Sequence, residues 1–520
     1  MQTRPFSSLR MANPETSLAW LSVAAVLLSF FLALGRAPLF DVDEGAFSQA
    51  TLEMFQRGDY LSTYLNGEPR YDKPILVYWL QAASVLAFGP TEFAFRLPSA
   101  LCATLWCALV FLFTRAAYGA TAAWLAAACT ATSVGVFIIG RSATADGLLN
   151  LLVAASMFAA WLHLKSGGRQ WLYAAFAAAA LGVMAKGPVA VLIPFCVTLA
   201  FCLVRRDFGT WLRATFDPRA LLVFALIAAP WYLIILYKEG WAFVEGFFLK
   251  HNVERFGQPL QGHGGSLVYY IPVVLIASMP HTGLLIKTLM KIRQVWRDDL
   301  QCYLLLWFAF VFIFFSLSGT KLPHYVLYGM TGLFILMAVQ AAQLQSRLWL
   351  LLPTVLFFAF LLAFPGLVEV LGSKIQDPYY RDALNEAGDQ FPAAYYMYAA
   401  AATVFAAWLI LERRVAAPLK LVACGALSVA ALAAFVVPAL GAMLQEPVKQ
   451  AALLARSRGY PVIMWGINAP SFSVYYGRPT PSRAPRPGDI VITKAKRLAE
   501  LPGFDTLYAR KGVVLVRIKE

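Results

Sequence analysis

The sequence is poor in charged residues. Only 14% of its 520 residues are Asp, Glu, Lys or Arg, whereas 60% are hydrophobic and the mean hydropathy is +0.64. Soluble domains carry roughly a quarter charged residues, so this composition excludes an ordinary soluble domain. We therefore predict an all-α polytopic membrane protein.

Other signals are missing as well. The seven cysteines lie in or beside apolar segments without the paired spacing of a metal site, and we interpret them as packing residues. No Gly-rich phosphate loop precedes a helix, and no repeat of 20 to 50 residues is evident. Nothing in the sequence predicts nucleotide binding or a repeat architecture.

Long apolar segments recur along the chain. A membrane helix needs about 20 residues to cross about 30 Å of hydrocarbon. The run 75–88 is shorter and is interrupted by Gln81, so we expect an interfacial helix there. We expect the first segment to be a retained span and not a cleaved signal peptide. Thirteen segments are predicted spans: 17–35, 94–114, 119–140, 145–165, 169–185, 188–204, 220–238, 266–286, 299–317, 323–343, 348–370, 394–411 and 418–440.

The positive charges support one orientation. Cytoplasmic loops of membrane proteins collect Lys and Arg close to the helix ends. With the N-terminus in the cytoplasm, the segments on that side carry Arg4, Arg10, Arg115, Lys165, Arg169, Arg205, Arg206, Arg213, Arg219, Lys287, Lys291, Arg293, Arg297, Arg347, Arg413, Arg414 and Lys420. Most of the net charge of +15 is explained in this way and requires no nucleic-acid partner. Thirteen crossings place the loop 41–93 and the tail 441–520 outside the cytoplasm.

The tail differs in composition from the rest of the chain. It has a helical pattern at 446–457 and short apolar strands at 461–465, 489–493 and 512–518. We predict a transmembrane domain over 1–440 and a small extracytoplasmic α/β domain over 441–520. A domain of this size holds only a small core, so it is expected to lean on the membrane part.

Acidic residues gather at the outer ends of the apolar segments. Asp43 and Glu44 open a predicted amphipathic helix, 44–57, that we expect to lie flat on the membrane surface, and Asp146 follows the third segment. Helix capping is an alternative explanation for each acid, and Asp146 could instead pair with Arg141. Two acids in one pocket would imply a metal ion, a cationic group or a perturbed pKa.

Three outer lysines stand beside Pro or Gly, against the positive-inside tendency: Lys73, Lys186 and Lys321. Each could be a lysine that snorkels at a helix end, but three on one face predict an anion site for phosphate. The longest outer loop of the membrane part, 247–265, holds His251 and His263. These imidazoles could bind Zn²⁺ with a carboxylate, although their spacing matches no standard metal motif.

Taken together, these motifs resemble a known family. The resemblance runs through about residues 17–343, and it is to the aminoarabinose transferases of lipid A. These belong, with the protein O-mannosyltransferases, to the GT-C glycosyltransferases that use polyprenyl-phosphate sugars. The matching motifs are Asp43-Glu44-Gly45, Gly58-Asp59-Tyr60, Asp72-Lys73-Pro74, Phe95-Arg96-Leu97-Pro98, Asp146, Lys186-Gly187-Pro188, Arg255-Phe256, Tyr269-Tyr270-Ile271-Pro272 and Lys321-Leu322-Pro323. The chain departs from the family at Ala46-Phe47, where an Arg-Tyr pair is usual, and at Asp72, where Glu is usual.

The resemblance implies a role for each motif. Asp43 would be catalytic with support from Asp146 and Glu44. The carrier phosphate would be held by Lys73, Lys186, Arg255, Lys321 and Tyr325. Asp72 with His251 and His263 would hold a divalent metal ion, either Zn²⁺ or Mg²⁺ or Mn²⁺, and no nucleotide would be needed.

The implied function is an inverting glycosyltransferase of the bacterial inner membrane. It would move a sugar from an undecaprenyl-phosphate type donor, at the periplasmic face, to lipid A, another glycan or a protein. An alternative is a transporter or flippase of a lipid-linked glycan, but such proteins usually place charges near the bilayer midplane, often in paired repeats. A sensor or assembly factor without catalytic activity is a third interpretation.

Overall fold

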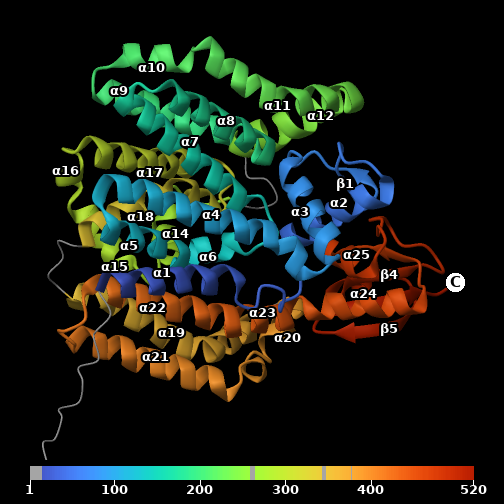
Figure 1. The fold of residues 1–520 in the computed structure, drawn as a ribbon. Coiled ribbons are helices and arrows are strands. Elements are labelled where there is room, and N and C mark those ends of the chain that lie inside the picture. The colour runs from blue at the N-terminus through green and yellow to red at the C-terminus, as the bar shows by residue number, and fades with distance from the viewer. Residues whose placement is uncertain (1–13, 258–263, 342–346, 376) are drawn as a thin grey trace, which may run out of the picture.

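The computed structural model describes residues 14–257, 264–341, 347–375 and 377–520. Long helices lie side by side in a bundle, and the C-terminal sheet lies at one end beside α2 and α3 (Figure 1). The bundle comprises α1 (Pro14–Phe31), α4 (Glu92–Tyr118), α5 (Ala120–Thr132), α6 (Val134–Gly140), α7 (Asp146–Ser166), α8 (Arg169–Lys186), α9 (Val189–Val204), α10 (Phe208–Thr215), α11 (Pro218–Glu239), α14 (Tyr270–Ala277), α15 (Thr282–Met290), α16 (Ile292–Val295), α17 (Asp299–Leu317), α18 (Leu327–Ala341), α19 (Arg347–Lys374), α20 (Pro378–Leu384), α21 (Ala393–Leu411), α22 (Ala417–Ala431) and α23 (Val437–Leu444).

The chain is a multi-pass membrane protein. Among the described residues, eight helices are long and apolar enough to cross a membrane, or nine if the bent pair α5 and α6 is one span. All thirteen predicted segments contain helix, but several depart from a simple span. The axis turns by 68° between α5 and α6, the segment 266–286 is broken into α14 and α15, and α1 and α9 are short. The number of thirteen crossings stays a prediction.

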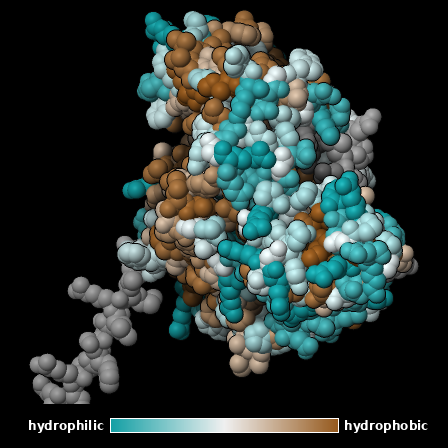
Figure 2. Space-filling view, turned by 90° about the vertical axis from the view of Figure 1, so that its right-hand side faces the viewer, coloured by the Kyte–Doolittle hydropathy of each residue, from teal (hydrophilic) through white to brown (hydrophobic). Residues whose placement is uncertain are grey.

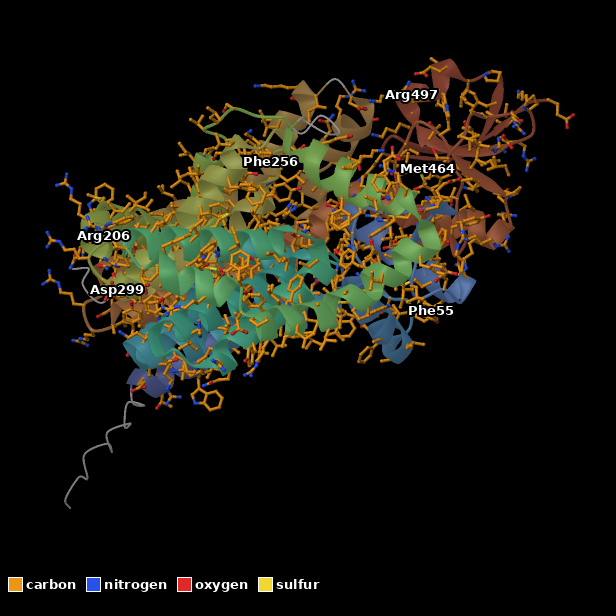
Figure 3. The ribbon with its side chains drawn as sticks, turned by 90° about the horizontal axis from the view of Figure 1, so that it is seen from above. Phe55, Arg206, Phe256, Asp299, Met464 and Arg497 are labelled. Atoms are coloured by element: carbon orange, nitrogen blue, oxygen red, sulfur yellow. The ribbon has the colours of Figure 1, made fainter. Side chains whose placement is uncertain are left out.

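The two ends of the bundle differ. Arg206 and Asp299 lie at the end opposite to Phe55, Met464 and Arg497 (Figure 3). Figure 2 shows the end that carries the C-terminal domain, and most of this surface is hydrophilic, with hydrophobic surface gathered toward one side. The predicted basic face and the predicted outer face are therefore at opposite ends of the molecule.

The helix predicted at 44–57 is present as α2 (Asp43–Arg57). Its position flat on a membrane surface stays a prediction, but the lipid-facing apolar side that this position implies is not found. Most of α2 is buried, because it packs against α3 (Leu76–Phe88) on one side and α25 (Pro470–Tyr476) on another. A short hairpin, β1 (Tyr64–Leu65) with β2 (Glu68–Pro69), follows it. The apolar residues of α2 thus face protein and not lipid.

The predicted outer loop 247–265 is largely helical up to residue 257. It continues α12 (Trp241–Phe243) through the π-helix η1 (Val244–Glu254) into α13 (Arg255–Gly257). Phe243 and Phe247 are buried and their rings stack with centroids 5.5 Å apart. Packing of these aromatic rings explains why the segment is helical, although its polar residues predicted a loop.

The C-terminal domain has the predicted α/β character. It contains α24 (Glu446–Arg458), β3 (Val462–Met464), α25, β4 (Ile490–Lys494), η5 (Ala495–Glu500), β5 (Phe504–Arg510) and β6 (Val513–Ile518). The sheet order is β3-β4-β6-β5, and only the β3-β4 pair is parallel. The sequence did not predict β5, since this edge strand is mostly exposed and lacks an apolar pattern.

Candidate active site

A buried polar cluster forms where α7 begins and α8 ends. These two helices are antiparallel neighbours, so Asp146 at the start of α7 meets Lys186 at the end of α8. The Asp146 carboxylate accepts hydrogen bonds from Lys186 Nζ at 2.5 Å and from the Tyr328 hydroxyl at 2.7 Å. The alternative pairing of Asp146 with Arg141 is wrong, because Arg141 donates to the carbonyls of Ser29 and Leu32.

Two residues of this cluster were not predicted from the sequence. His324 Nε2 lies 3.7 Å from Asp146 Oδ1, and Tyr328 bonds to both Asp146 and Lys186. They belong to the 3-10 helix η2 (Pro323–Val326) and to α18, which continues from it. A spacing of four residues places both side chains on one helix face. That spacing was the signal in the sequence that could have found them.

Two adjoining cavities connect this cluster with the loop after α1. The smaller, of about 50 Å³, is lined by Asp43, Phe47, Lys73, Thr144, Asp146, Lys186, Leu322, His324 and Tyr325. The larger, of about 180 Å³, is lined by Asp72, Lys73, Lys186, Tyr325, Tyr328, Ser318 and the apolar side chains Pro188, Val189, Leu192, Phe256, Phe314 and Phe315. Lys73, Lys186 and Tyr325 belong to both cavities. The structure thus brings the predicted carboxylates of Asp43 and Asp146 together with two predicted phosphate-binding lysines.

Glu44 has a different position from its neighbour Asp43. It forms a buried ion pair with Arg96, with bonds of 2.8 and 2.7 Å, and accepts from the backbone amides of Phe40 and Ala143, each at 2.8 Å. Burial raises the pKa of Glu44, but the charge and hydrogen bonds of Arg96 outweigh it and hold the pKa below its usual range. Glu44 therefore braces the segment before α2 against the loop before Asp146, and it does not line either cavity.

Lys321 is also placed apart from the other predicted lysines. Its side chain is buried, and Nζ donates to the Ser318 carbonyl at 2.5 Å. It is absent from the described residues that line the two cavities. Of the three lysines predicted to bind phosphate, Lys73 and Lys186 line the cavities and Lys321 does not.

The predicted metal ligands are only partly described. Asp72 lines the larger cavity and pairs with Arg70 at 3.4 Å. His263 lies outside the described residues, as do the side chains of His251 and Arg255. Within the part of the chain that the structure describes, no three His, Cys, Asp or Glu side chains group together as a metal site. A metal ion on Asp72, His251 and His263 stays a prediction.

Asp41, two residues before Asp43, has an unusual environment. It accepts hydrogen bonds from the backbone amide of Ser471 at 2.8 Å and from the Ser471 hydroxyl at 2.5 Å. Burial raises the pKa of Asp41 from 3.8 to about 7, with a smaller contribution from Glu44, although the Ser471 hydrogen bonds lower it.

The stability of the wild-type protein is expected to fall, relative to Asp41→Asn, as the pH rises from about 5 to about 8. The folded state keeps a proton on Asp41 up to about pH 7, whereas the unfolded chain loses it near 3.8. The stabilisation is fully present below the pKa of the unfolded chain and is lost as the pH rises through the pKa of the folded state. We expect the free energy of unfolding to change by an amount on the order of 2 kcal/mol. Unfolding midpoints of both proteins across this pH range test it.

Asp59→Asn is the control for this pH series. Burial raises the pKa of Asp59, but its bond with Lys238 overcomes this and holds the pKa below the ordinary value. Its contribution is therefore constant from pH 5 to pH 8. The expectation would be contradicted if the difference in stability between the wild type and Asp41→Asn did not change between pH 5 and pH 8.

Comparison with known proteins reveals sequence and structural relatives. Residues 72–238 match a family model described as dolichyl-phosphate-mannose-protein mannosyltransferase. The chain is 32% identical over 345 residues to the undecaprenyl phosphate-alpha-4-amino-4-deoxy-L-arabinose arabinosyl transferase of Serratia proteamaculans, covering 62% of this chain and 61% of that protein. With the transferase of the same name from Aeromonas salmonicida it shares 29% identity over 339 residues, covering 63% and 60%. The matched part thus spans about three fifths of the length of these relatives.

Solved structures extend the similarity, at the level of the fold, over nearly the whole chain. ArnT from Cupriavidus metallidurans bound to undecaprenyl phosphate superposes with a TM-score of 0.79 at 22% identity, covering 96% of this chain and 98% of that one. The same protein in the apo state gives a TM-score of 0.78 at 21% identity. The predicted fold class, a helical membrane protein with a small C-terminal α/β domain, is confirmed.

Proposed function

We propose that this chain, which is an aminoarabinose transferase-like GT-C protein in sequence and fold, is an integral-membrane glycosyltransferase. It transfers a sugar from an undecaprenyl-phosphate type donor to lipid A or to another glycan or protein acceptor of the envelope. The names of the relatives, undecaprenyl phosphate-aminoarabinose arabinosyl transferases, support both the donor and the reaction class. A lipid-phosphate carrier is further supported by the structural relative from Cupriavidus metallidurans, which was solved with undecaprenyl phosphate bound.

One observation carries the proposal: Asp43, Lys73, Asp146 and Lys186 line one cavity. In the transfer, the bond between the anomeric carbon and the phosphate oxygen breaks, and the phosphate leaves with the electron pair. The ammonium groups of Lys73 and Lys186 stabilise the charge that develops on this oxygen. Asp146 and Tyr328 hold Lys186 in place, so that little reorganisation is needed during the reaction.

Asp43 completes the reaction by accepting the proton of the acceptor hydroxyl while the new bond forms to the anomeric carbon. Attack from the face opposite to the phosphate inverts this carbon. The products are the glycosylated acceptor and the free polyprenyl phosphate. The Phe256, Phe314 and Phe315 side chains make the larger cavity mostly apolar, which suits the first isoprene units of the carrier.

The proposed location is the bacterial inner membrane, with the N-terminus in the cytoplasm and the C-terminal domain in the periplasm. The basic loops support this orientation by the positive-inside rule, since Arg206 lies at the opposite end of the bundle from the C-terminal domain (Figure 3). A divalent ion held by Asp72 with His251 or His263 stays part of the proposal. Loss of activity with a chelator, and its return with Zn²⁺, Mg²⁺ or Mn²⁺, would test that part.

The function is tested with the purified protein, undecaprenyl phosphate-4-amino-4-deoxy-L-arabinose as donor and lipid A as acceptor. The expected result is a lipid A product heavier by one sugar unit, together with free undecaprenyl phosphate, both seen by mass spectrometry. A protein that moves the labelled donor across a proteoliposome membrane and forms no covalent product would be a transporter instead. Mass spectrometry of envelope lipids and glycans, with and without the protein, identifies the acceptor if lipid A is not used.

Lys73→Met is expected to raise the donor KM by about 10-fold to 100-fold, because a charge-assisted hydrogen bond to phosphate contributes about 1.5 to 3 kcal/mol. Lys321→Met is the matched control. The Lys321 side chain donates to the Ser318 carbonyl and does not line either described cavity. Its donor KM should stay within about 3-fold of the wild-type value. Equal effects of the two changes on steady-state kinetics would contradict this placement of the phosphate.

A further inference from the structure

The segment between α1 and α2 is held by the C-terminal domain at two points. The backbone amide of Leu39 donates to the Tyr475 hydroxyl at 2.7 Å, and the Asp41 carboxylate accepts both bonds from Ser471. Ser471 and Tyr475 lie on α25, more than 400 positions further along the chain. Asp41, the last residue of the segment in these contacts, lies two residues before Asp43.

Gly45 shows how closely α25 approaches the first turn of α2. A Cβ atom at Gly45 would lie 2.4 Å from the Ser471 amide nitrogen and 2.3 Å from Asp41 Oδ1. Backbone atoms cannot give way at such distances, so this contact requires glycine. The interface is therefore built for direct contact between α25 and the helix that starts with Asp43.

The helix α25 is itself anchored to other parts of the molecule. The Tyr475 hydroxyl donates to Glu92 at 3.1 Å, and Lys449 on α24 pairs with the same carboxylate at 2.7 Å. Glu92 opens α4, one turn before Arg96, the residue that pairs with Glu44. The segment 39–44 is thus fixed from the C-terminal domain on one side and from α4 on the other.

We propose that Ser471 and Tyr475 are positioning residues that hold the Asp43 carboxylate in the geometry required for sugar transfer, so that the C-terminal domain is part of the catalytic unit. This inference rests on the proposed function and assigns a role to a domain for which the sequence suggested none. Ser471 and Tyr475 do not line the described cavities and act only through the segment 39–43.

The expected effect is on the chemical step. Asp43 is an exposed residue in the first turn of α2, so its position depends on the backbone that precedes it. Displacement of a reacting group by about 1 Å can lower the rate by about 100-fold. Lys73 and Lys186 belong to other segments, and donor binding should therefore be preserved when α25 loses its contacts.

The test compares Ser471→Ala and Tyr475→Phe with the matched control Ser473→Ala in the full-length protein. Ser473 is a buried serine on the same helix, and its hydroxyl donates to Thr480 at 2.9 Å without a bond to the segment 39–45. The readouts are kcat, donor KM, binding of undecaprenyl phosphate, and hydrogen exchange of the amides of residues 39–46. Tyr475→Phe keeps the ring volume and serves as the second variant if Ser471→Ala does not fold.

We expect both α25 variants to lose roughly 10-fold to 100-fold in kcat, with donor KM and undecaprenyl phosphate binding unchanged and with faster exchange over residues 39–46. Ser473→Ala should match the wild type in all four readouts. Wild-type kcat in the α25 variants, or a loss shared equally by Ser473→Ala, would overturn the inference. Absence of transfer by the wild-type protein would instead reject the proposed function, so the two failures are distinguishable.

Discussion

Asp43→Asn is expected to lower kcat for sugar transfer by about 100-fold to 10,000-fold, the range that a positioned general base contributes. The amide keeps the shape of the carboxylate but cannot accept the acceptor proton. The donor KM should change little, because Lys73 and Lys186 remain on the cavity wall. Steady-state kinetics with the undecaprenyl-phosphate sugar donor measure both quantities.

Asp59→Asn is the control for Asp43→Asn. Asp59 lies shortly after α2 and pairs with Lys238 on α11, and it is not among the described residues that line the cavities. Its kcat should equal that of the wild type. Transfer at the wild-type rate by Asp43→Asn would show that Asp43 neither removes the proton nor orients the acceptor.

Arg96→Met is expected to destabilise the protein by about 3 to 5 kcal/mol, because it leaves the Glu44 carboxylate buried without its partner. The guanidinium also donates to the carbonyls of Leu34, Ala37 and Pro38, which lose these bonds. Denaturant or thermal unfolding in detergent measures the change. The paired variant Glu44→Met/Arg96→Met should recover only the part of the loss that comes from the unpaired charge. The bonds to the backbone carbonyls are not restored, and the amides of Phe40 and Ala143 lose the carboxylate to which they donate.

Lys496→Met gives the corresponding change at an exposed ion pair. Lys496 pairs with Asp377 at 2.6 Å on the surface, and such pairs contribute about 0 to 1 kcal/mol. A loss in Arg96→Met no larger than that in Lys496→Met would contradict the bracing role of the Glu44–Arg96 pair. If Arg96→Met lost activity without losing stability, Glu44 would have a role in the reaction, as the sequence resemblance implied.

Several features could be predicted because their signals are local. Apolar runs of membrane length identified the helices, and polar residues at the ends of those runs identified Asp43, Lys73, Asp146 and Lys186. The strands β3, β4 and β6 followed from short buried apolar runs. Each of these signals is contained within about 20 residues, and each is required by the bilayer or by a sheet core.

Other features could not be predicted because they depend on distant partners. The pattern of α2 shows an apolar face, but whether lipid or α25 covers it depends on a helix more than 400 residues away. Asp43 and Glu44 are adjacent in sequence, yet one faces the cavity and the other pairs with Arg96. Lys321 and Lys186 have similar sequence surroundings, and only Lys186 reaches Asp146.

Local signals in the sequence were enough to predict the membrane class, the helical segments, the small C-terminal domain and the kind of polar residues at the outer ends of the helices. Hydrophobic periodicity and the cost of charge near hydrocarbon act on short stretches of chain, so they can be detected without a structure. The folded structure was needed to show which carboxylate contacts which cation, and that the C-terminal domain holds the segment before Asp43. Ion pairs and hydrogen bonds act over a few ångströms, and only the folded chain brings such distant residues within that range.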